Sequence, residues 1–77
     1  MLNISENIKR LRQEKGVTQE ELANTVGVTF QAVSKWELGH GYPDITLLPE
    51  LAEYFGVSID ALVREDSEAR KRELEKR

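Results

Sequence analysis

The residue types that most often carry enzyme chemistry are scarce in this chain of 77 residues. It has no cysteine, which excludes disulfides, thiolate metal sites and cysteine nucleophiles. The single histidine, His40, lies between two glycines, and no second metal ligand stands at a suitable spacing from it. Paired carboxylates, a nucleophile constellation and a phosphate-binding loop are also missing from the sequence. We therefore do not expect an enzyme, a metal site or another cofactor, and no small-molecule ligand is indicated.

Binding chemistry is concentrated instead in two short helices predicted close together in the sequence. Thr18 as N-cap and Glu21 three residues later form a capping box, which predicts the start of the first helix. Gly27 ends that helix, and Thr29 is placed to cap the next one. Helices of about eight residues are not stable alone, so a tight mutual crossing must hold this pair together.

The second of these helices has an inner and an outer side. Val33 and Trp36 face inward, and the small side chain of Ala23 allows the two helices to approach closely. The outward set is Thr29, Phe30, Gln31, Ser34 and Lys35. Phe30 faces away from Val33 and Trp36, which favours contact with a groove, although a place in the core is the alternative. This is the helix-turn-helix pattern, which presents one helix face to a groove.

A helix is also predicted near the start of the chain. Ile4, Ile8 and Leu11 recur at helical spacing over about three turns. Asn3 can cap this helix, with Glu6 three residues on, and a glycine follows its last turn.

Two further helices are predicted towards the other end. Pro49 has no N–H group to donate, so it must lie in or near a first turn, and the fourth helix begins no earlier than about Asp44. Gly56 ends it, and Ser58 caps a short fifth helix. No segment alternates at period two for long enough to predict a strand. The expected fold is all-α, with five helices.

The charges are distributed unevenly along the chain. Net charge is −3, which taken alone argues against a nucleic-acid partner. Basic residues nevertheless crowd one segment (Lys9, Arg10, Arg12 and Lys15), whereas residues 37–60 contain acids and no Lys or Arg. A dipolar protein can present a basic face despite a negative total. The basic run is most simply a solvated face, and the alternative is contact of Lys9 or Arg10 with phosphate.

The length allows one small domain, predicted over residues 1–63, followed by a charged tail over residues 64–77. The tail has two apolar residues and several acid-before-base pairs at helical spacing, so we expect a frayed, solvated helix or a linker. No apolar leader opens the sequence, and no apolar run approaches 18 residues. A cytoplasmic protein is expected.

The sequence resembles the lambda-repressor-like helix-turn-helix domain, the Cro/cI or XRE type of bacterial and phage regulators. The motifs that carry the resemblance are ENIKRLRQEKGVTQEELA, VSKWELG, YPD and LAEYFGVSIDALV, in the order and spacing of that family. The match covers about residues 3–63. It implies a compact five-helix DNA-binding domain of a cytoplasmic, nucleoid-associated regulator that binds a double-stranded DNA operator, generally as a homodimer. Such a regulator is expected to be a repressor.

The resemblance also implies roles for single residues. Phe30, Gln31 and Lys35 match base-reading positions, where they suit a thymine methyl, adenine N6/N7 and guanine O6/N7 respectively. The positions expected to contact the DNA backbone are Gln19, Thr29, Ser34, His40 and Tyr42. Arg12 and Glu37 match an ion pair that joins the first helix to the end of the third. Phe30 departs from the polar residue often found at its position.

Two expectations remain open at this stage. The negative net charge keeps a second hypothesis, a protein-interaction module on the same scaffold, for example an antitoxin or an antirepressor. For the dimer, the expected contact surface is the fifth helix, through Ile59, Leu62 and Val63.

Overall fold

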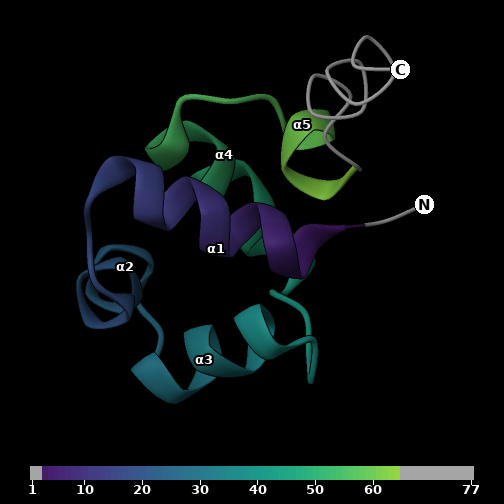
Figure 1. Ribbon diagram of the computed structural model, residues 1–77. Coiled ribbons are helices and arrows are strands. Elements are labelled where there is room, and N and C mark those ends of the chain that lie inside the picture. Colours follow the sequence, from purple (N-terminus) through teal and green to yellow (C-terminus); the bar gives the residue numbers. More distant parts are fainter. Residues whose placement is uncertain (1–2, 65–77) are drawn as a thin grey trace, which may run out of the picture.

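The computed structural model describes residues 3–64, which form five α-helices (Figure 1). They are α1 (Ile4–Lys15), α2 (Gln19–Val26), α3 (Phe30–Leu38), α4 (Leu48–Phe55) and α5 (Ile59–Val63), with one 3-10 turn, η1 (Ile45–Leu47), before α4. The predicted all-α, five-helix fold is confirmed. Apart from Arg64, the charged tail lies outside the described residues. Between residues 3 and 64, no helix is both long and apolar enough to cross a lipid bilayer.

The predicted caps explain where three of the helices begin. The side chains of Thr18, Thr29 and Ser58 each accept a hydrogen bond from the backbone N–H three residues later, at 3.0, 3.3 and 2.9 Å. Gly27 has a φ of +76°, and a Cβ added there would meet no atom within 4 Å. The left-handed backbone, rather than crowding, therefore selects glycine at the turn between α2 and α3.

The start of α1 differs from the prediction, whereas the start of α4 agrees with it. Asn3 precedes α1, but its side chain makes no capping bond, and its Nδ2 donates instead to Glu6 Oε2 at 3.1 Å. The φ of −139° and ψ of 39° at Asn3 are not the extended backbone that a capping residue needs, so this expectation was wrong. Pro49 lies in the first turn of α4 as predicted. The preceding turn from Ile45 to Leu47 is 3-10, and Asp44 caps it by accepting from Thr46 N at 2.9 Å.

The helices surround one apolar core. α1 runs through the middle, with α3 on one side and α4 and α5 on the other, and α2 packs on α3 (Figure 1). The fully buried apolar side chains come from all five helices: Ile8, Leu22, Val33, Leu51 and Leu62. Ala23 and Trp36 are buried as predicted. Because Leu62 is completely covered inside the domain, its expected place on a dimer surface was wrong.

Candidate nucleic-acid interface

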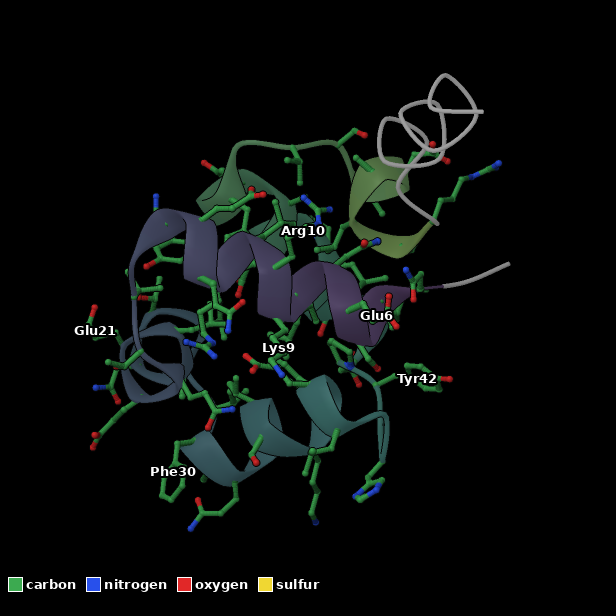
Figure 2. The ribbon with its side chains drawn as sticks, in the orientation of Figure 1. Glu6, Lys9, Arg10, Glu21, Phe30 and Tyr42 are labelled. Atoms are coloured by element: carbon green, nitrogen blue, oxygen red, sulfur yellow. The ribbon has the colours of Figure 1, made fainter. Side chains whose placement is uncertain are left out.

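The outer side of α3 is the candidate interface. Phe30 is 50% exposed and Gln31 and Lys35 are exposed, whereas Val33 and Trp36 of the same helix are buried. Phe30 therefore lies outside the core, and Figure 2 shows its ring pointing away from the other helices. Ser34 is half-buried and Thr29 is exposed at the N-cap. The hydrophobic spacing fixes this orientation, because burying Val33 and Trp36 turns the remaining side chains outward.

The charges on α3 suit an anionic partner although the whole chain is acidic. Lys35 is the only Lys or Arg between residues 16 and 63. The one acidic residue of α3, Glu37, has a side chain only 4% exposed. The outer side of α3 thus shows one cation and no exposed carboxylate. A net charge of −3 does not describe this face.

Glu37 is neutralised where it is buried. Arg12 Nε donates to Glu37 Oε2 at 2.6 Å, and Arg12 Nη2 donates to Glu37 Oε1 at 3.0 Å. The guanidinium therefore binds both carboxylate oxygens. The remaining nitrogen, Arg12 Nη1, donates to the backbone oxygen of Val17 at 2.9 Å. The hydrogen bond to Glu37 raises the pKa of Arg12 above its usual value. The ion pair expected from the sequence is present, and it joins α1 to the last turn of α3.

A second partner of Glu37 was not expected from the sequence. Gln19 Nε2 donates to Glu37 Oε1 at 3.1 Å, which links the first residue of α2 to the same carboxylate. The sequence assigned Gln19 only to the DNA backbone. A carboxylate bound by an arginine still has lone pairs for a further donor, but the sequence does not show that Gln19 supplies it.

The remaining predicted backbone contacts lie at the two ends of α3. Thr29 Oγ1 accepts from Ala32 N, and its hydroxyl hydrogen remains available as a donor. His40 is exposed in the loop after α3, and its backbone N–H donates to Lys35 O at 2.9 Å, which fixes the loop on the end of the helix. Tyr42 is 69% exposed and points outward from this loop (Figure 2).

Other surfaces suit DNA less well. Arg10 lies on the side of α1 away from α3, and its guanidinium bonds Glu14 and Asn7 (Figure 2). An open hollow of about 540 Å³ separates α2 from α4, and Glu50 and Glu53 line it. Two carboxylates without a lysine or arginine in the lining would repel phosphate. In residues 3–64 there is also no group of three or more His, Asp or Glu side chains that could hold a metal ion.

Comparison with known proteins shows that the chain is similar to transcriptional regulators. A family model described as helix-turn-helix matches residues 8–62. The HTH-type transcriptional activator BcrR of Enterococcus faecalis is 40% identical over 62 residues, covering 80% of this chain and 30% of the activator. The cryptic phage CTXphi transcriptional repressor RstR of Vibrio cholerae is 39% identical over 64 residues, covering 83% of this chain and 57% of the repressor. The chain thus spans about a third to just over half the length of these curated relatives.

Among solved structures, the P22 c2 repressor in complex with a synthetic operator superposes with a TM-score of 0.75 and 30% sequence identity. The match covers 79% of this chain and 92% of that chain.

Proposed function

The chain belongs to the helix-turn-helix family, and from this premise we propose that it binds double-stranded DNA sequence-specifically and represses transcription. The observation that carries the proposal is the outer side of α3, where Phe30, Gln31 and Lys35 are exposed and the only carboxylate of the helix is buried. A helix of this kind fits the major groove, where each base pair presents a distinct pattern of donors and acceptors. The DNA-binding domain is proposed to be residues 1–63.

Each exposed residue of α3 receives a role from its chemistry. Gln31 pairs with adenine N6/N7, Lys35 with guanine O6/N7, and Phe30 packs on a thymine methyl. The groups that position the domain on the backbone are Gln19, Thr29, Ser34, His40 and Tyr42. The backbone N–H groups of Gln19 and Glu20 precede the first intrahelical hydrogen bond of α2 and carry partial positive charge, so they add to the phosphate contacts.

Repression is the proposed mode because of what the relatives share with this chain. The activator BcrR is matched over 30% of its own length. The repressor RstR matches over 57%, and the P22 c2 repressor chain over 92%. A domain that occupies an operator blocks other proteins from the same DNA. The proposed setting is the DNA of the cytoplasm, with a homodimer on the operator.

The test is selection of bound duplexes from a random DNA pool, followed by affinity measurements over a range of salt concentrations. A DNA-binding protein should enrich one motif, and log Kobs should fall linearly with log salt, with a slope of about −0.9 per phosphate neutralised. An unenriched pool with weak, salt-insensitive binding would contradict the proposal. That outcome would favour the protein-interaction module, the class of function that the acidic net charge suggests.

A further inference from the structure

The carboxylate of Glu37 collects donors from two elements that meet the end of α3. Arg12 of α1 gives two of the hydrogen bonds, at 2.6 and 3.0 Å, and Gln19 of α2 gives the third, at 3.1 Å. The Glu37 side chain is 4% exposed, so these donors replace the water that a carboxylate would otherwise bind. The ion pair accounts for Arg12, but it leaves the bond to Gln19 without a role.

The bond to Glu37 determines which end of the Gln19 amide faces the carboxylate. An ionised carboxylate only accepts hydrogen bonds, so it must meet the nitrogen of the amide and not the oxygen. One N–H of that nitrogen points at Glu37 Oε1, and the second N–H is left for another acceptor. A phosphate oxygen is also an acceptor only, so it requires this same nitrogen. A rotated amide would instead present its oxygen to the phosphate and repel it.

The charge of Glu37 would oppose phosphate if it were uncompensated. The guanidinium of Arg12 binds both carboxylate oxygens of Glu37, so the ion pair carries no net charge. Glu37 can therefore orient a neutral donor beside DNA without adding a net negative charge there.

We infer that Glu37 is a positioning residue for DNA binding, which fixes the amide of Gln19 so that its free N–H meets a backbone phosphate. The inference rests on the proposed function, because it concerns the phosphate contact of the same interface. It gives Glu37 a second task beyond joining α1 to α3, and this task depends on Gln19.

The test is a double-mutant cycle in DNA affinity, with Gln19→Ala, Glu37→Gln and the double variant on the duplex selected from the pool. Gln19→Ala should weaken binding about tenfold, as expected for a lost hydrogen bond to a charged group. Glu37→Gln should weaken binding by a similar factor when Gln19 is present, and much less when residue 19 is alanine. Glu14→Gln is the matched control, because it removes the same charge from a side chain that is 61% exposed on α1.

A variant that leaves Arg12 without a carboxylate partner can fail to fold, so Glu37→Asp provides a second test. Aspartate keeps the charge for Arg12 but withdraws the carboxylate from Gln19 by one methylene. Its loss of affinity should likewise disappear in the Gln19→Ala background. Equal factors in both backgrounds would show a purely structural effect of Glu37 and overturn the inference, as would a Gln19→Ala protein that binds like the parent. A parent that binds no duplex would instead overturn the proposed function.

Discussion

At the scale of single residues, the direction in which each side chain of α3 faces decides what it can do. Val33 and Trp36 are buried, so changes there act through stability. Gln31 and Lys35 are exposed, so they contribute little to the core. Substitutions of Gln31 or Lys35 should therefore change the affinity for DNA and not the free energy of unfolding.

Replacing Gln31 or Lys35 with alanine should cost about 1–3 kcal/mol of binding free energy and relax the preference at one base position. The physical reason is the loss of a side chain that pairs with the edge of one base. Affinities for duplexes carrying each single-base change in the selected motif measure both effects. Gln13→Ala is the control, because Gln13 is an exposed glutamine on α1. An equal loss on all duplexes would contradict direct reading of the base by these residues.

Single residues also show how far the sequence alone could go at the site. The exposed positions of α3 follow from the spacing of Val33 and Trp36, and the partner of Glu37 followed from a family resemblance. The bond from Gln19 to Glu37 could not be predicted, because residues 18 positions apart meet only through the crossing of α2 and α3. A pattern read along one helix does not give the distance between two helices.

At the scale of elements, two polar links hold the helices in place. One is the ion pair from α1 to α3, in which Arg12 is 15% and Glu37 4% exposed. Pairs on the surface contribute little, about 0–1 kcal/mol, but a buried charge that loses its partner is costly. The burial of this pair makes it an anchor for the orientation of α3.

Glu37→Ala should destabilise the fold by about 3–5 kcal/mol, because Arg12 is then left without its carboxylate. The double variant Arg12→Ala, Glu37→Ala should lose much less than the sum of the two single losses. Urea unfolding of the parent, both single variants and the double variant measures this. Glu14→Ala, which removes an exposed partner of Arg10, should change stability by no more than about 0.5 kcal/mol. Additive losses at residues 12 and 37 would mean that the pair does not anchor the fold.

The second link joins α1 to the end of α5 and centres on Asn7. This side chain is 1% exposed, and its Nδ2 donates to the backbone oxygens of Leu62, at 2.8 Å, and of Arg64. The last carbonyls of a helix lack intrahelical donors, so Asn7 satisfies groups that α5 leaves open. The backbone N–H of Asn3 adds a bond to Val63 O at 2.9 Å.

Asn7→Ala should cost about 1–3 kcal/mol of stability, because buried carbonyls lose their donor. The loss should be local, with faster amide hydrogen exchange in α5 than in α3. Asn24→Ala on α2 is the control, since Asn24 is exposed. Exchange that accelerates equally in α3 and α5 would show that Asn7 supports the whole core and not one helix end.

Elements were predicted better than the contacts between them, for a physical reason. Caps and glycine stops act within a few residues, so the limits of α2 and α3 and the start of α5 follow from local chemistry. The hydrogen bonds of Asn7 could not be predicted because their acceptors lie more than 50 residues away, at the other end of the domain. Leu62 was misplaced on the surface because α5 has five residues, too few for its buried side to be read from spacing.

At the scale of the whole molecule, one domain offers a small reading surface. The three proposed base-reading residues all lie on α3, which has nine residues. Two copies related by a two-fold axis would double the base contacts, with half-sites about one helical turn, roughly 34 Å, apart. A surface for the second copy must be exposed and apolar. Of the three residues expected at this contact on α5, Ile59 is 42% exposed, Val63 is half-buried and Leu62 is covered, so Ile59 is the residue to test.

We therefore predict that a palindromic duplex binds two protomers and that Ile59 contributes to their contact. Ile59→Gln should leave binding to a single half-site unchanged, because this residue is distant in sequence from α3 and already exposed. It should, however, weaken assembly of the two-protomer complex on the palindrome, since an apolar contact is lost. Sedimentation of protein with labelled full-site and half-site duplexes measures both quantities. Ile45→Gln is the matched control, because Ile45 is also exposed, at 77%, but lies in η1. One protomer per palindromic duplex at saturation would rule out the dimer, and equal effects of the two substitutions would place the contact elsewhere.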